Sequence, residues 1–376
     1  MLDEATLAWP FFDEAHRELA SRLSDAADRL DDGHGGDVDA ACRSLVRSLG
    51  QSGLLKLCVG TDGRAPDVRS LALAREALAR RSGLADFAFA MQGLGSGAIT
   101  LSGSSEQRGE YLGAVASGEA IAAFAMTEPE AGSDAASIAM TARPDGADYR
   151  LDGEKTYISN GGIADIYTVL ARTGEPGPRG LSMFIVRADD PGLQVVERIE
   201  VIAPHPLARL RFDGVRADLI GTSGEGFAIA MRTLNLFRVT VGAAALGFAR
   251  RALDEALRFA VGRRLGAGTL ADNAVTQANL AEMALAIDAS SLLIYRAAWQ
   301  QDVGNQDVRS AAAMAKLHAT ENAQRVIDMA VQMHGGSGVQ VGTKVESLYR
   351  DIRALRIYEG ATEVQQLIIG KSVLRE

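Results

Sequence analysis

The sequence is poor in cysteine, in basic charge and in aromatic residues. Cys42 and Cys58 are the only cysteines among 376 residues, too few for a disulfide framework and without the spacing of a zinc site. Lysine and arginine total 39 against 48 aspartates and glutamates, which gives a net charge of -9. A surface of that sign repels nucleic-acid phosphates and anionic lipids, so we expect no nucleic-acid partner.

Long uncharged runs are also missing. No stretch approaches the ~18 consecutive apolar residues that a membrane span needs, and the chain begins with an acidic segment where a secretory signal would be basic. The 5 histidines do not fall in a metal-ligand spacing such as H-E-x-x-H. We therefore expect a cytoplasmic protein with no membrane span and no metal site.

Three kinds of sequence follow one another along the chain. Residues 1–121 show helical periodicity with few strand signals. Residues 122–221 contain short β-rich runs, such as Ser182–Val186, separated by Gly, Pro and Asp turns. Residues 222–376 return to long helical stripes, which are typical of antiparallel helices in a bundle. The predicted domains are these three segments.

Two glycine motifs suggest phosphate binding only superficially. Gly93–Ala98 fits the pattern G-x-G-x-x-G/A, but it lies in a helical region and no β-α-β alternation follows. We predict close helix packing there instead. Gly370–Ser372 resembles the end of a phosphate loop, but Gln365 stands where the leading glycine belongs.

Two other segments carry more information. Ala125–Asp134 concentrates hydroxyls and carboxylates in a loop at the entry to the β-rich region, and such loops present polar groups to a ligand or simply cover a surface. In Arg356–Glu363, Glu359 precedes a glycine ahead of an apolar helical run. A glutamate at such a junction is either a helix cap or a base held in an apolar pocket.

The chain resembles the acyl-CoA dehydrogenases, a family of flavin enzymes, over nearly its whole length. The resemblance rests on an ordered series of motifs: Ser104–Arg108, Ala125–Asp134, Lys155–Gly161, Gly224–Phe227, Gln332–Gly338, Leu348–Asp351 and Tyr358–Gly360. It implies an α+β, mainly α fold, with an N-terminal helical domain, a small barrel-like middle β domain and a C-terminal four-helix bundle.

The resemblance also implies an activity. It is the FAD-dependent conversion of an acyl thioester, on CoA or on an acyl-carrier protein, to the trans-2-enoyl thioester. Glu359 matches the base that takes the α-proton, and flavin N5 would take the β-hydride. The implied partners are an electron-transfer flavoprotein and further copies of the chain, as a dimer or a tetramer.

The motifs assign further site residues by resemblance. Flavin contacts are implied for Met126, Thr127, Tyr157, Ser159, Arg263, Gln332, Gly336 and Thr362. Substrate contacts are implied for Ser133, Asn235, Arg238 and Gly360.

The chain departs from the family pattern near Arg263. Gly266 and Ala267 stand where a Phe-Gly pair is usual, and Ala274 stands where a glutamine is usual. Phe237 occupies the position from which some branches take their base, which leaves Glu359 as the base at a recognised position. Two alternatives stay open: a flavin oxidase or monooxygenase on the same fold, and a structural homologue that has lost FAD.

Overall fold

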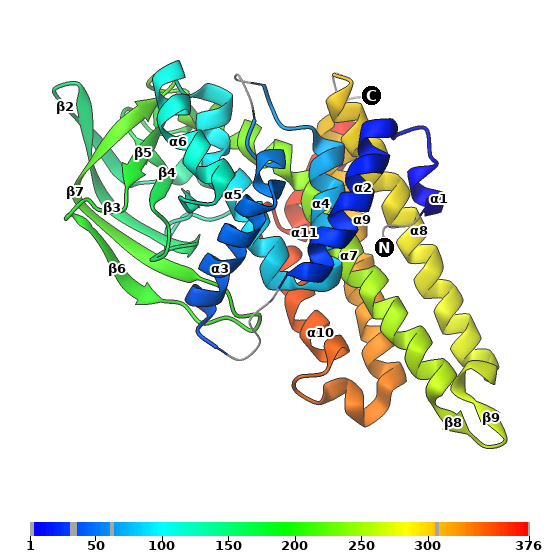
Figure 1. Cartoon of the computed structure of the whole chain (residues 1–376). Coiled ribbons are helices and arrows are strands. Elements are labelled where there is room, and N and C mark those ends of the chain that lie inside the picture. Colours follow the sequence, from blue (N-terminus) through cyan, green and yellow to red (C-terminus); the bar gives the residue numbers. More distant parts are fainter. Residues whose placement is uncertain (1–3, 31–35, 61–63, 305–307, 375–376) are drawn as a thin grey trace. The chain divides into compact units, whose positions relative to one another are not determined.

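The structure is a computed structural model that describes residues 4–30, 36–60, 64–304 and 308–374. Helices form both ends of the chain and a β-sheet lies between them in sequence (Figure 1). This order confirms the predicted fold class. The helices before the sheet are α1 (Glu4–Leu7), α2 (Glu14–Arg29), α3 (Val38–Gln51), α4 (Val68–Arg81), α5 (Gly83–Ser102) and α6 (Ser105–Ser117).

Local sequence explains several helix boundaries. Ser104 caps α6 through a capping box, because its side chain accepts from the Gln107 N–H while the Gln107 side chain accepts from the Ser104 N–H. Gly118 ends α6 with a φ of 75°. Asn273 caps a later helix by accepting two N–H groups of its first turn.

The glycine-rich part of α5 serves close packing. A Cβ at Gly95 would lie 2.6 Å from the Ala122 backbone, and a Cβ at Gly93 would lie 2.6 Å from the Phe237 ring. The glycines therefore let α5 approach its neighbours closely. The prediction of helix packing in place of a dinucleotide loop is confirmed.

The β-sheet closes on itself. Its strands are β1 (Ala122–Ala125), β2 (Thr141–Asp145), β3 (Asp148–Ser159), β4 (Ile166–Arg172), β5 (Leu181–Arg187), β6 (Leu193–Arg198) and β7 (Leu207–Ile220). They pair in the order β1-β4-β2-β3-β7-β5, and β5 also pairs with β4, so β4, β2, β3, β7 and β5 form a closed ring. The pairing agrees with the predicted barrel-like domain. Alternation of buried side chains along β7 fills its interior.

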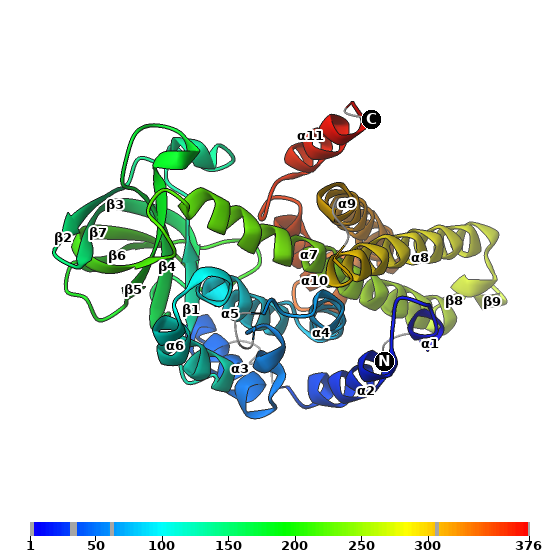
Figure 2. The ribbon, with the colours of Figure 1, turned by 90° about the horizontal axis from the view of Figure 1, so that it is seen from above.

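The C-terminal helices pack around small residues. They are α7 (Gly226–Gly262), α8 (Ala274–Asp302), α9 (Val308–His334), α10 (Lys344–Leu355) and α11 (Thr362–Val373), and a short hairpin of β8 (Arg264–Leu265) and β9 (Gly268–Thr269) joins α7 to α8. Helix α9 contacts α8, α10 and α11 (Figure 2). Gly242 lets α7 pack closely on both α8 and α9.

Two of these helices are long and apolar enough to cross a membrane by length and composition. In α7, 83% of the apolar window is buried within the protein, as in the core helix of a globular protein. In α8, only 33% of the window is buried. The absence of a membrane span stays a prediction.

The chain divides into two compact units. The helical unit comprises residues 1–29, 68–86 and 238–376, and the barrel unit comprises residues 30–67 and 87–237.

Candidate active site

In the helical unit, Glu359 lies in a strained turn between α10 and α11. Its φ is 52°, and Gly360 follows with a φ of 94°. A non-glycine residue in this region costs roughly 1–2 kcal/mol. Such strain persists only where the surrounding structure holds it, and it gathers at functional sites.

The Glu359 carboxylate is shielded from solvent. Its Oε2 atom is buried and accepts no hydrogen bond from the residues that the structure describes. Burial raises its pKa, and the cations Arg75, Lys316 and Arg238 oppose that rise. A carboxylate of this kind is a stronger base than a solvated one, and the nearby cations keep its ionised form accessible.

Arg75 is itself held by a buried ion pair. Its Nε and Nη2 atoms each lie 2.8 Å from the Asp86 carboxylate, and its Nη1 donates to the Thr240 hydroxyl at 3.1 Å. Arg75 and Asp86 are both buried. Burial also raises the pKa of Tyr358, the neighbour of Glu359 in the turn. The base therefore sits beside a fixed, nearly neutral polar cluster.

The turn that carries Glu359 is tied to α9 and α11. The Gly360 carbonyl accepts hydrogen bonds from Lys316 Nζ at 2.7 Å and from Gln365 Nε2 at 2.8 Å. Lys316 is fully buried, and burial lowers its pKa to about 8. Thr362, a predicted flavin contact, donates its hydroxyl to Glu321 of α9.

In the barrel unit, a buried ion pair organises the loop after β1. Lys155 Nζ lies 2.9 Å from both Glu128 Oε1 and the Met126 carbonyl. The Glu128 carboxylate also accepts the N–H groups of Ala139 and Met140. Its position fixes the loop from 126 to 140 against β3. Met126, one of the predicted flavin contacts, is therefore held in place by the hydrogen bond that its carbonyl accepts from Lys155.

The end of β3 presents Tyr157 outward. Its φ is 54°, its side chain is 63% exposed, and the pairing of β3 with β7 shifts register between Lys155 and Ile158. The Thr127 carbonyl accepts the N–H of Thr156, which joins the loop to this strand. The structure thus brings Met126, Thr127, Tyr157 and Ser159 together on two bonded segments. Ser133 lies exposed farther along the same loop.

A cleft of about 420 Å³ lies at the C-terminal end of α7, in the helical unit. Its lining includes Arg263 and Gly336, two predicted flavin contacts, together with Arg264, Leu265 and His334. The His334 ring stacks on Phe259. Gln332, the third predicted contact of this group, is exposed on α9 and is not part of the lining.

The departures from the family pattern fall beside this cleft. Gly266 turns the β8–β9 hairpin with a φ of 59°, and a Cβ there would meet no atom within 4 Å. The Gln277 amide donates to the Ala271 carbonyl within the next turn.

The remaining predicted substrate residues lie on α7. Asn235 is half-buried and belongs to the barrel unit, whereas Arg238 is buried and belongs to the helical unit, where it faces Glu359. Burial lowers the pKa of Arg238, while the Glu359 carboxylate opposes that effect.

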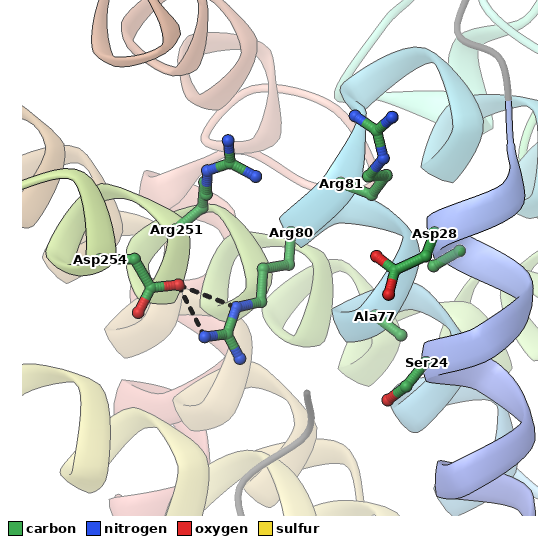
Figure 3. A pocket seen from close by; sticks show the side chains of 8 residues that line it. Ser24, Asp28, Ala77, Arg80, Arg81, Arg251 and Asp254 are labelled. Carbon is green, nitrogen blue, oxygen red and sulfur yellow. Dashed lines mark hydrogen bonds and ion pairs between the residues drawn. The ribbon is translucent and has the colours of Figure 1, made fainter. Parts of the chain in front are cut away.

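A second hollow of about 210 Å³ lies between α2, α4 and α7 (Figure 3). Arg80 points across it and pairs with Asp254 at 2.6 Å. Arg251, also in the lining, pairs with Glu255 at 2.7 Å. Arg80 and Arg251 are therefore both paired with carboxylates, and the lining also includes Arg81 and Asp28.

Sequence reasoning did not identify Lys316, Arg75 and the Lys155–Glu128 pair. A signal was present for the first two, because each is a single cation inside an apolar helical run, 311–317 and 71–79. A charge on an apolar helix face is buried, and buried charges are paired or hydrogen-bonded. No comparable signal marks Lys155 and Glu128, which are 27 residues apart in sequence.

Three consecutive segments of the chain match domains of one family. Residues 10–119 match the N-terminal domain of acyl-CoA dehydrogenase, residues 123–215 its middle domain and residues 224–374 its C-terminal domain. The chain is 34% identical to a 3-(aryl)acrylate reductase of Clostridium sporogenes, over 97% of this chain and 100% of that protein. It is also 34% identical to the cyclohexane-1-carbonyl-CoA dehydrogenase of Geobacter metallireducens, over 96% of both chains.

Solved structures are similar over the same length. The butyryl-CoA dehydrogenase of Megasphaera elsdenii has a TM-score of 0.90 and 30% identity, and the match covers 97% of this chain and 99% of that one. A chain from a structure described as the electron transferring flavoprotein of Acidaminococcus fermentans has a TM-score of 0.91 and 31% identity, with coverage of 97% and 99%. A structure described as PigA with FAD and proline has a TM-score of 0.87 and 27% identity, with the same coverage. The chain belongs to the acyl-CoA dehydrogenase family of oxidoreductases.

Proposed function

We propose that this protein dehydrogenates an acyl thioester between its α and β carbons, with Glu359 as the base that removes the α-proton. The observation that carries the proposal is the Glu359 carboxylate. It is shielded, its Oε2 has no hydrogen-bond partner among the described residues, and it is held in a strained turn with a raised pKa. A carboxylate kept available in this way suits abstraction of a weakly acidic C–H proton.

The same turn offers a donor for the substrate carbonyl. Within the described residues, the main-chain N–H of Glu359 donates to no other group. An orphan N–H beside the base can donate to the thioester oxygen, where negative charge develops as the proton leaves. The Glu359 residue would thus act twice, through its side chain and through its backbone.

The residues present fit FAD in two places. Tyr157 exposes an aromatic face beside hydroxyl and main-chain groups, as an isoalloxazine ring requires. The cleft at Arg263 and Gly336 has room, basic side chains and glycine backbone for a dinucleotide phosphate, and a Cβ at Gly336 would meet no atom within 4 Å. When bound, FAD supplies the acceptor for the β-hydride.

The partners follow from the same reasoning. We propose CoA or an acyl-carrier protein as the carrier and an electron-transfer flavoprotein as the electron acceptor. We also propose a homo-oligomer. Exposed apolar side chains support it, because a surface helix of a monomer would place such residues inside. They are Val275, Leu285 and Leu292 on α8 and Val261 and Leu265 beside the cleft.

The test is anaerobic bleaching of the flavin spectrum of the FAD-loaded protein. The panel contains straight-chain, cyclic and aryl-substituted acyl thioesters on CoA and on acyl-carrier protein. We expect one class to bleach the wild type. Glu359→Gln should abolish bleaching while FAD stays bound, because the amide cannot accept the α-proton. Glu18→Gln, at an exposed position on α2, is the matched control and should behave as the wild type.

Two outcomes would contradict the proposal. If no thioester bleaches bound FAD, the protein is not an acyl-thioester dehydrogenase, and the oxidase or monooxygenase alternative should be tested by reoxidation with oxygen. If Glu359→Gln bleaches as fast as the wild type, another residue is the base.

A further inference from the structure

The turn from Arg356 to Thr362 is held from α9 at several points. Glu321 of α9 binds Arg356 at one end of the turn, with Nε–Oε1 at 2.9 Å, and accepts the Thr362 hydroxyl at the other end. Lys316 reaches the middle of the turn from five residues earlier on α9. These contacts fix the ends and the centre of one short segment.

At the centre, the Gly360 carbonyl accepts two donors of different kinds. Lys316 Nζ, at 2.7 Å, carries a full charge, whereas Gln365 Nε2, at 2.8 Å, is neutral. A charge-assisted hydrogen bond is roughly twice as strong as a neutral one. The Gly360 carbonyl belongs to the peptide that joins Gly360 to Ala361, one peptide beyond Glu359, so holding it restrains the backbone of Gly360 and, through the planar Glu359–Gly360 peptide, that of Glu359.

We propose that Lys316 is a positioning residue for Glu359: its buried ammonium holds the Gly360 carbonyl and thereby the left-handed backbone that aims the Glu359 carboxylate and N–H. The inference deepens the proposed function and rests on it. Lys316 acts on the reaction through Glu359 and its turn, whereas Glu359 itself contacts the reacting atoms.

The ammonium has a second effect that a neutral donor lacks. It faces the Glu359 carboxylate and opposes the rise in its pKa that burial causes. The charged and titratable groups that face Glu359 are Arg75 on α4, Asp86 on α5, Arg238 on α7, Lys316 on α9 and the adjacent Tyr358. Those that face Lys316 are Glu359, Arg238, Glu321 and Glu363.

Two variants separate the hydrogen bond to the Gly360 carbonyl from the charge of the Lys316 ammonium. Lys316→Met removes the hydrogen bond and the charge, and Gln365→Leu removes only a hydrogen bond to the same carbonyl. Lys371→Met, at an exposed lysine of α11, is the matched control. We measure kcat/KM against pH with the thioester that bleaches the wild type. We also measure hydrogen exchange of the segment 356–362 in the FAD-loaded protein without substrate.

Lys316→Met should lower kcat/KM by about a hundred-fold, the cost of a misplaced reacting group. The acid limb of the kcat/KM profile, where Glu359 must be ionised, should move to higher pH, because the variant lacks the Lys316 ammonium that opposes the rise in the Glu359 pKa. Burial lowers the pKa of Lys316 to about 8, so its ammonium is charged below that pH in the wild type. Gln365→Leu should lower kcat/KM by about ten-fold with the acid limb unchanged, since it removes the weaker donor. Exchange of 356–362 should accelerate in both variants and not in Lys371→Met.

The outcomes are distinguishable from those of the proposed function. A wild type that no thioester bleaches overturns both proposals. If the wild type is bleached but Lys316→Met keeps its kcat/KM and its acid limb, the positioning role alone is wrong. If Lys316→Met does not fold, Gln365→Leu is the test. Unchanged kcat/KM and unchanged hydrogen exchange in that variant would show that the hydrogen bonds to the Gly360 carbonyl do not position Glu359.

Discussion

Replacing Lys155 by methionine should destabilise the barrel unit and weaken the FAD binding proposed above. Lys155 is fully buried, and its Nζ makes the two hydrogen bonds, each of 2.9 Å, to Glu128 and to the Met126 carbonyl. Methionine fills a similar volume but leaves the Glu128 carboxylate buried without its counter-ion. Breaking one partner of a buried ion pair costs about 3–5 kcal/mol. Two remaining donors, the N–H groups of Ala139 and Met140, place this case at the lower end of that range.

The assay is urea unfolding of the protein without FAD, followed by FAD titration. Lys155→Met should lose about 3 kcal/mol in the free energy of unfolding. Lys155→Met/Glu128→Gln should recover part of that loss, because no buried charge is left unpaired. The double-mutant cycle should give a coupling of at least about 1 kcal/mol. A Lys155→Met protein within about 0.5 kcal/mol of the wild type would refute the reasoning.

The pH dependence of this variant has a defined sign. Burial lowers the pKa of Lys155 from 10.5 to about 8 in the folded chain. Between those two values the unfolded chain binds more protons than the folded one, so the free energy of unfolding rises with pH. Lys155→Met should lack that rise. An equal rise in both proteins would show that other groups cause it.

Three further perturbations test other parts of the structure. Arg75→Met should lower the free energy of unfolding by about 3–5 kcal/mol, because it leaves Asp86 buried and unpaired. It should also move the acid limb of the kcat/KM profile to higher pH, and an unmoved limb would mean that Arg75 does not act on Glu359. Tyr157→Gly should leave the stability of the FAD-free protein nearly unchanged, since relief of roughly 1–2 kcal/mol of backbone strain offsets the entropy cost of glycine. The same change should weaken FAD binding, measured by titration, up to about ten-fold. Gly247→Ala should cost about 1–3 kcal/mol in thermal or urea unfolding, because its Cβ would lie 2.4 Å from the Glu76 carbonyl oxygen; a neutral change would show that α7 and α4 separate easily.

Much of the fold could be predicted because its signals are local. Helical periodicity and turn residues divide the chain into helical, β and helical parts, and the structure has the same order. The closure of the sheet could not be read from periodicity. It depends on the pairing of β5 with β4 and of β2 with β4, which are contacts between separate strands.

The resemblance of ordered motifs to those of the acyl-CoA dehydrogenases predicted Glu359 as the candidate base and the segments 125–134 and 155–161 as the candidate flavin face, because such motifs keep their order along the chain. Only the tertiary structure decided how these residues are held. Lys316 and Gln365 reach Gly360 from two different helices, and Lys155 reaches Glu128 across a loop. A buried charge takes its partner from whatever folding places within a few ångströms, and burial together with that partner sets its pKa. The motifs therefore point to a candidate base, and packing decides what that group can do.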